Sequence, residues 1–163
     1  MAPGSPADRN TLRPGDRLLR INGQVIGDHI DYRYHASEET LLVEVERQGQ
    51  PVVATVCKEI DEDLGLELKE PRYKTCQNKC IFCFVSQMPS GLRRSLYVKD
   101  DDYRLSFMHG NYITLTNLEE HNFRRIFQQH LSPLYVSVHA TDDNIRREIL
   151  GNPAAPSLLP ILK

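Results

Sequence analysis

The sequence predicts two domains of different fold class: a small, β-rich α+β domain followed by an α/β domain. Over residues 1–58, short apolar segments alternate with tight-turn dipeptides, as in short antiparallel strands. Residues 71–163 instead alternate strand-like and amphipathic helical segments, which is the pattern of parallel βαβ units. Between them, residues 59–70 hold six acidic side chains and one lysine, so we expect a solvated acidic linker there.

The composition is that of an ordinary globular protein. Hydrophobic residues make up 40% of the 163 positions and charged residues 26%. A net charge of −2 gives no nucleic-acid footprint. The N-terminus lacks the basic and apolar regions of a signal peptide, and no apolar run approaches the roughly 20 residues of a membrane span. We therefore expect a cytoplasmic protein without a membrane partner, in a compartment that keeps thiols reduced.

The first domain is predicted from short strands joined by turns. Asn22-Gly23 is a tight-turn dipeptide that reverses the chain after the first strand. Asp28 is placed to cap a short helix. Strands are expected at residues 17–21, 24–26, 40–47 and 52–56.

The second domain is predicted as repeated strand–helix units. Asn117 is expected to cap the helix after the second strand, and Thr141 or Asp142 the helix after the third. Gly151 ends that last helix, because glycine tolerates the left-handed backbone of a helix C-terminus. Strands are expected at residues 71–75, 112–116 and 134–139, with a further helix between the first two.

Three of the four cysteines fall within eight residues, spaced Cys-x3-Cys-x2-Cys, at Cys76, Cys80 and Cys83. Thiolates are soft ligands that suit iron–sulfur clusters and zinc. Three of them on one loop can bind a single metal centre and leave one position without a thiolate, where chemistry can take place. The spacing therefore indicates a metal centre with an open site.

Three other uses of these cysteines remain open at this point. A disulfide would require an oxidising compartment, which nothing in the sequence suggests. A structural zinc site needs four closed ligands, and a ferredoxin-type cluster needs a fourth thiolate. Cys57 is the one remaining cysteine that can supply it.

The stretch Cys-Gln-Asn-Lys-Cys-Ile-Phe-Cys-Phe at residues 76–84 resembles the signature of the radical S-adenosylmethionine enzymes, including an aromatic residue before the third cysteine. The resemblance implies that the three cysteines hold a 4Fe–4S cluster whose unique iron binds S-adenosylmethionine. It also implies a reductant such as flavodoxin or ferredoxin. Reduction then cleaves the cofactor to methionine and a 5′-deoxyadenosyl radical, which takes hydrogen from a substrate that the sequence does not identify.

The same resemblance suggests cofactor-binding residues. Phe82 would shield the cluster or stack near the adenine. Thr116 and Asn117 stand where many of these enzymes carry Gly-Gly-Glu, and their oxygens can accept from the cofactor's ammonium group. Ser137 and His139 alternate at the end of a strand, so both would face the barrel mouth. Plain alternatives are Asn117 as a helix cap and His139 as a packed strand residue.

Residues 4–7, Gly-Ser-Pro-Ala, and the stretch Leu-Arg-Pro-Gly-Asp-Arg-Leu-Leu-Arg-Ile-Asn-Gly at residues 12–23 resemble a bacterial PDZ domain extending over residues 3–58. The resemblance implies a protein partner. The strand and carboxylate-binding loop of a PDZ peptide groove normally precede the Gly-Ser-Pro-Ala segment. We therefore expect a clipped domain that serves for packing or docking.

Taken together, the two halves resemble the first part of a bacterial family of radical S-adenosylmethionine proteins with an N-terminal PDZ-like domain and a C-terminal domain of unknown function. We expect an open, curved, three-stranded parallel sheet, the first part of a (β/α) barrel, with the cysteine loop at its C-terminal edge. Because a complete barrel has more strands, we expect an incomplete chain that is not active alone.

A dense patch of mixed charge follows the cysteine loop. It contains Arg93, Arg94 and Lys99 next to three consecutive aspartates at residues 100–102. Two interpretations remain open: the patch neutralises itself on the surface, or the two arginines contact an anionic substrate or the cofactor carboxylate.

Overall fold

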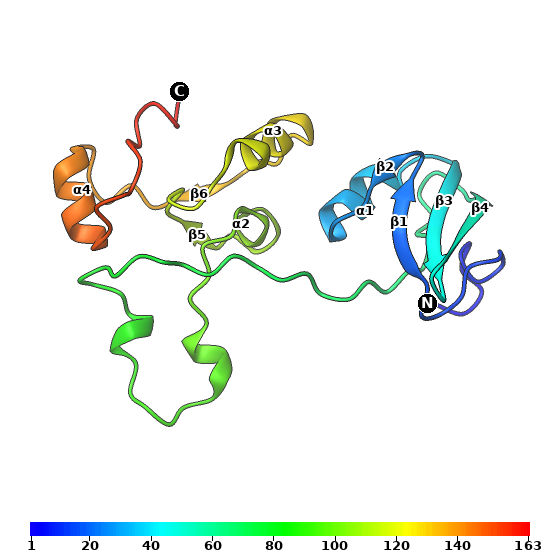
Figure 1. Ribbon diagram of the computed structural model, residues 1–163, viewed down its shortest axis with the longest axis horizontal. Helices are drawn as coiled ribbons and strands as arrows, with labels where there is room; N and C mark the ends of the chain where they lie inside the picture. The colour runs from blue at the N-terminus through cyan, green and yellow to red at the C-terminus, as the bar shows by residue number, and fades with distance from the viewer. The chain divides into compact units, whose positions relative to one another are not determined.

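The computed structural model describes residues 1–163 and divides into two compact units, Met1–Arg72 and Tyr73–Lys163. Figure 1 shows the strands β1 to β4 in the first unit and the helices α2 to α4 in the second. The helices are all short, and none has both the length and the apolar surface needed to cross a membrane.

The first unit is built on a four-stranded antiparallel sheet with the strand order β2-β1-β3-β4. The predicted strands are confirmed, and the hairpin between the last two is longer than expected, since it pairs Arg47 with Gln50. Asp28 caps the helix as predicted, accepting from the amides of Ile30 and Asp31 at 3.0 and 3.2 Å. The elements are β1 (Arg17–Ile21), β2 (Gln24–Val25), α1 (His29–His35), β3 (Thr40–Arg47) and β4 (Gln50–Cys57).

The core of this unit lies against the central strand β3. Leu41, Val43 and Val45 are buried at every second position, so one face of the strand is apolar and the other is exposed. Ile21 of β1 and Val56 of β4 are also fully buried and belong to the same cluster. The period-two pattern of the sequence thus positions the core directly.

The acidic segment 59–70 contributes to this core. Leu64 is 1% exposed, and Leu66 and Leu68 pack partly buried against the same cluster. The amide of Ala7 donates to the carbonyl of Leu64 at 3.0 Å. We expected solvent around the whole segment. Instead its three leucines recur at every second position, so one side of the segment packs on the first unit while its acidic side chains stay outside.

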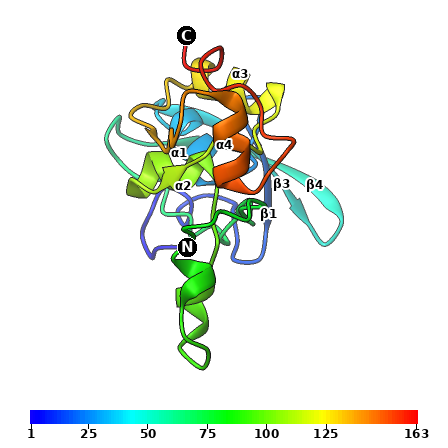
Figure 2. The ribbon, with the colours of Figure 1, turned by 90° about the vertical axis from the view of Figure 1, so that its left-hand side faces the viewer.

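The second unit contains one parallel strand pair. β5 and β6 pair Tyr112 with Tyr135 and Ile113 with Val136, and the amide of Ser137 extends the ladder by donating to Ile113 at 2.8 Å. The short helices η1 and η2 belong to a loop, drawn in green, that extends away from α2 and α4 in both views (Figures 1 and 2). The elements are η1 (Val85–Gln87), η2 (Arg94–Tyr97), α2 (Tyr103–His109), β5 (Tyr112–Ile113), α3 (Glu120–Gln128), β6 (Tyr135–Val136) and α4 (Asp143–Leu150).

The expectation of a three-stranded parallel sheet is wrong in this structure, because residues 71–75 form no strand. Thr75 instead makes an isolated antiparallel bridge with Asp100. The amide of Lys74 is taken by the Asp102 carboxylate at 2.7 Å, and the amide of Cys76 donates to Lys99 at 2.8 Å. These contacts occupy the donors that a parallel ladder would have used.

One helix start differs from the prediction. α3 is capped by Glu119, whose side chain forms a reciprocal capping box with Asn122, and not by Asn117. A helix was expected before the strand at residues 112–116, and α2 lies there, capped by Asp102, which accepts from the Arg104 amide. In α4 the prediction is confirmed, with Asp142 as the cap and a left-handed glycine after Leu150.

Leu41→Ala should destabilise the first unit by roughly 2–5 kcal/mol, because it leaves a cavity at a fully buried position. Leu42→Ala is the matched control, because the Leu42 side chain lies on the other face of β3 and is 43% exposed. Urea unfolding of both variants measures the difference. Equal losses of unfolding free energy would contradict the assignment of the buried face.

Candidate metal centre

The three clustered cysteines of the second unit line one pocket. Cys76, Cys80 and Cys83 all border a cavity of about 320 Å³, and each is a free thiol. Aromatic and aliphatic side chains border it as well, together with Lys99 and the polar residues Asn78, Asp100 and Asn111. These further lining residues include Phe84, Val85, Val98, Lys99 and Tyr112.

Short backbone contacts shape the loop that carries the cysteines. The amide of Cys76 donates to the carbonyl of Lys99 at 2.8 Å, which ties the start of the loop to the strand-like segment before α2. The amide of Cys83 donates to the carbonyl of Cys80 at 3.2 Å, so these two residues share one tight turn. The carbonyl of Cys83 in turn accepts from the amide of Gln87, the last residue of η1, at 3.2 Å. The spacing Cys-x2-Cys is therefore realised as a turn that leads into a short helix.

The three thiols differ in acidity. Burial raises the pKa of Cys76 and of Cys80, and neighbouring thiolates raise that of Cys80 further. Burial also acts to raise the pKa of Cys83, but hydrogen bonds from Ser86 and the charge of Lys99 outweigh it, so the pKa of Cys83 is lowered.

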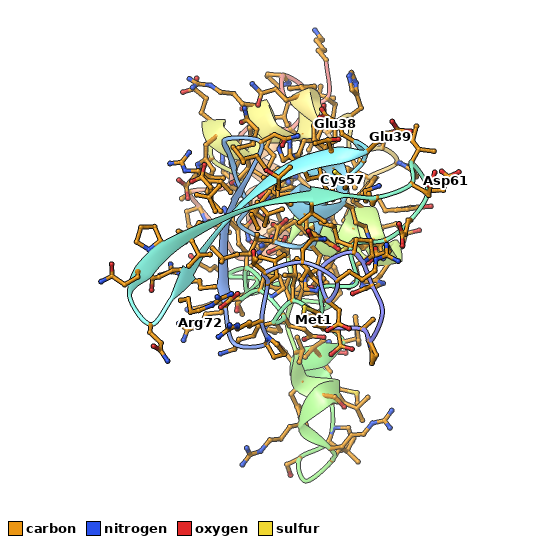
Figure 3. All side chains as sticks on the ribbon, turned by 90° about the vertical axis from the view of Figure 1, so that its right-hand side faces the viewer. Met1, Glu38, Glu39, Cys57, Asp61 and Arg72 are labelled. Atoms are coloured by element: carbon orange, nitrogen blue, oxygen red, sulfur yellow. The ribbon has the colours of Figure 1, made fainter.

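No group of three or more His, Cys, Asp or Glu side chains is gathered tightly enough to form a ready site for one metal ion. A tetrahedral zinc site requires ligands about 2.3 Å from a single point. In a 4Fe–4S cluster each thiolate binds a different iron. Cys57, the fourth thiolate that a closed site would need, is exposed at the end of β4 in the first unit (Figure 3).

Phe82 and His139, two of the predicted cofactor-binding residues, lie together. Their ring centroids are 4.9 Å apart with a tilt of 36°. His139 has a left-handed backbone, with φ of 63°, just after β6. Partial burial, and then the charge of Arg146, lower the pKa of His139. Ser137, two residues earlier, contributes its backbone amide to the β5–β6 ladder.

Thr116 and Asn117 lie in a polar network beside the loop and do not line the cysteine pocket. The Thr116 hydroxyl is 2.8 Å from that of Thr114 and 3.3 Å from the Asp101 carboxylate. The Asn117 amide donates to the carbonyl of Asp101 at 2.9 Å, while its Oδ1 is buried without a hydrogen-bond partner. Asn117 is thus the residue of this pair with an unused acceptor.

Two residues of this network, Asn78 and Asp101, were not predicted as site residues and are 3% and 2% exposed. Asn78 stands inside the cysteine motif, so its position was a usable signal. Asp101 belongs to a run of three aspartates, and such runs are usually solvated. Their burial depends on partners distant in sequence, which the local pattern does not reveal.

In the mixed-charge patch, the three aspartates do not pair with Arg93, Arg94 or Lys99, as a self-neutralising surface patch would require. The three aspartates turn toward other partners: Asp100 to Asn111 at 2.8 Å, Asp101 to Thr114 at 2.6 Å, and Asp102 to Arg104 at 2.7 Å. Arg93 and Arg94 are exposed at the start of η2.

Three free thiols bordering one cavity, on a loop beside a parallel strand pair, define the second unit as a candidate metal-cluster domain. Comparison with protein families agrees. Residues 58–163 match the model of a Radical SAM-like domain, and residues 1–47 match that of a PDZ domain. The chain therefore belongs to the family of Radical SAM-like domain proteins and carries a PDZ domain in front. A search of curated proteins found no match.

In the metal-free protein, Cys83 should react with iodoacetamide faster than Cys76 or Cys80 at pH 7, because its pKa is lowered and theirs are raised. Raising the pH should accelerate alkylation of Cys76 and Cys80 more than that of Cys83, since only thiolates react. Mass spectrometry of timed digests measures each rate. Faster labelling of Cys80 than of Cys83 would contradict the pKa order.

Proposed function

We propose that the second unit binds a 4Fe–4S cluster through Cys76, Cys80 and Cys83, and acts with S-adenosylmethionine as a radical enzyme domain. The observation that carries the proposal is that all three cysteines of the motif border one cavity as free thiols. Membership of the Radical SAM-like family supports the same assignment. The substrate is not identified by either line of support.

The donor set fits the group. Three thiolates would leave one iron of the cluster without a protein ligand, which is the position that the cofactor requires. When bound, the cluster supplies the electron that cleaves the cofactor's sulfonium and yields a 5′-deoxyadenosyl radical. The chain's own residues hold and shield this centre. Ser86 and Lys99 favour the thiolate of Cys83.

The cofactor-binding roles rest on the residues beside the loop. Neither Thr116 nor Asn117 borders the cysteine cavity, but Asn117 Oδ1 has no hydrogen-bond partner, whereas the Thr116 hydroxyl is engaged, so Asn117 is the proposed acceptor for the ammonium group of S-adenosylmethionine. Phe82 and His139 form a tilted aromatic pair on which an adenine ring can stack. Ser137 stands at the same strand end, where its hydroxyl can add a hydrogen bond.

The first unit would serve as a docking domain for a protein partner, as its match to a PDZ domain suggests. A one-electron donor such as flavodoxin or ferredoxin would reduce the cluster. Both roles suit a cytoplasmic protein, where such carriers are present and cysteines remain reduced.

Anaerobic reconstitution of the full chain with iron and sulfide tests the cluster. We expect about four irons per chain and the broad visible absorption of an iron–sulfur cluster. Cys76→Ala, Cys80→Ala and Cys83→Ala should each lose most of this iron. Cys57→Ala is the matched control and should keep it, because the proposed site uses no fourth thiolate.

The opposite result supports the rival function, a non-enzymatic PDZ-like interaction module with a structural zinc or ferredoxin-like site. In that case the protein would bind zinc, or its iron would fall in Cys57→Ala as much as in the other variants. Elemental analysis of the same four samples separates the two functions.

A further inference from the structure

Asn78 lies at the middle of the cysteine loop, between Cys76 and Cys80, and its side chain points into the protein. It is 3% exposed. Its Nδ2 donates to the hydroxyl oxygens of Thr114 and Thr116 at 3.0 and 3.1 Å. Its Oδ1 accepts from Asn152 Nδ2 at 2.7 Å. One side chain of the loop is therefore bonded both to the end of β5 and to the residues after α4.

The backbone on either side of Cys80 is bonded to the C-terminal end of α4. The amide of Lys79 donates to the carbonyl of Leu150 at 2.9 Å, and that of Ile81 to the carbonyl of Ile149 at 3.2 Å. The last carbonyls of a helix have no partner within the helix. Here the cysteine loop supplies two of the missing donors, so loop and helix end stabilise each other.

Gly151 allows this close approach. Its φ of 54° is left-handed, and a Cβ added to it would lie 2.5 Å from the carbonyl oxygen of Lys79. Any other residue would push the cysteine loop away from α4. By contrast Gly110, which ends α2 with φ of 75°, would place a Cβ at an ordinary 3.6 Å from the Tyr135 ring. The two helix-ending glycines differ only in what lies beside them.

The partners of Asn78 are themselves held in place. Asp101 accepts from the amide and the hydroxyl of Thr114, both at 2.6 Å. Arg146 of α4, which is 1% exposed, donates to the carbonyl of Thr114 at 2.6 Å. The threonines therefore form a rigid platform, since each has its position set by a buried charged group.

We propose that Asn78 is a positioning residue for the three-cysteine loop. By docking the loop on the threonine platform and on the end of α4, it holds Cys76 and Cys80 around the cavity before any metal is bound. The inference rests on the proposed function, because it concerns the same cysteines. Its benefit is preorganisation: a loop already ordered does not lose conformational entropy when the cluster binds.

The first test uses the metal-free full chain. Asn78→Ala should accelerate hydrogen exchange at the amides of Lys79 and Ile81, which lose the docking that protects them. Exchange in the β3–β4 hairpin of the first unit is the internal control and should not change. Unchanged protection of Lys79 and Ile81 would overturn the proposal.

The second test compares Gly151→Ala with Gly110→Ala, so that it does not depend on the folding of the Asn78 variant. Both variants place alanine at a left-handed helix end and should lower thermal stability, Gly151→Ala the more because of its close contact with Lys79. Only Gly151→Ala should also expose the Lys79 and Ile81 amides to exchange. Equal effects of the two variants on these amides would contradict docking on α4.

The third test measures the reconstituted cluster. Removal of a residue that orients metal ligands typically weakens a site by roughly 10–100-fold, so Asn78→Ala and Gly151→Ala should release iron to a chelator faster by that factor. The electron paramagnetic resonance signal of their reduced clusters should also change, while Gly110→Ala should match the parent chain. A parent-like release rate and signal in both loop variants would mean a structural role only, which overturns the positioning role.

Failure of the proposed function is recognised separately. If the parent chain binds no iron, the cluster assignment fails, while the exchange measurements on metal-free protein still decide whether Asn78 docks the loop. If the parent chain binds iron and the loop variants behave like it, the cluster stands and the positioning role of Asn78 is wrong.

Discussion

The second unit depends on the hydrogen bonds that satisfy the buried carboxylate of Asp101. A carboxylate that is 2% exposed must have its oxygens satisfied by the protein, because burial without partners costs several kcal/mol. Asp101 obtains these bonds from the amide and hydroxyl of Thr114 and from the hydroxyl of Thr116. This requirement fixes the turn after β5, and through Asn78 it fixes the cysteine loop as well.

Asp102 has a similar effect on the segment before the loop. Its fully buried carboxylate accepts from the Lys74 amide and pairs with Arg104. Burial acts to raise the pKa of Asp102, but the bonds from Arg104 and Lys74 outweigh it and keep the pKa low. Asp101 thus holds the turn after β5, and Asp102 holds Lys74 just before the cysteine loop. Their charge is directed inward, while Arg93 and Arg94 remain at the surface.

The sequence predicted those features that depend on neighbouring residues. Asn22-Gly23 predicted the first turn, and Asp28 and Asp142 the caps of two helices. Each follows from local backbone preference or from short separation along the chain.

Features that depend on distant partners were not predicted. Residues 71–75 carry the composition of an extended segment, yet Asp102 takes the Lys74 amide and no parallel ladder forms. Asn117 has the residue type of a helix cap, but its side chain is used by Asp101, so Glu119 caps α3 instead. Neither competition is visible in the local pattern, because the competing group, the Asp102 carboxylate in the first case and the Asp101 backbone carbonyl in the second, lies more than a dozen residues away.

The central claim is that three thiolates hold a cluster with one iron left open. The ⁵⁷Fe Mössbauer spectrum of the reconstituted chain, recorded with and without S-adenosylmethionine, tests it most directly. We expect the signal of about one iron in four to change when the cofactor is added, because only the iron without a cysteine ligand can bind it. A spectrum that does not respond to the cofactor, or a protein that takes up zinc in place of iron, would contradict the account.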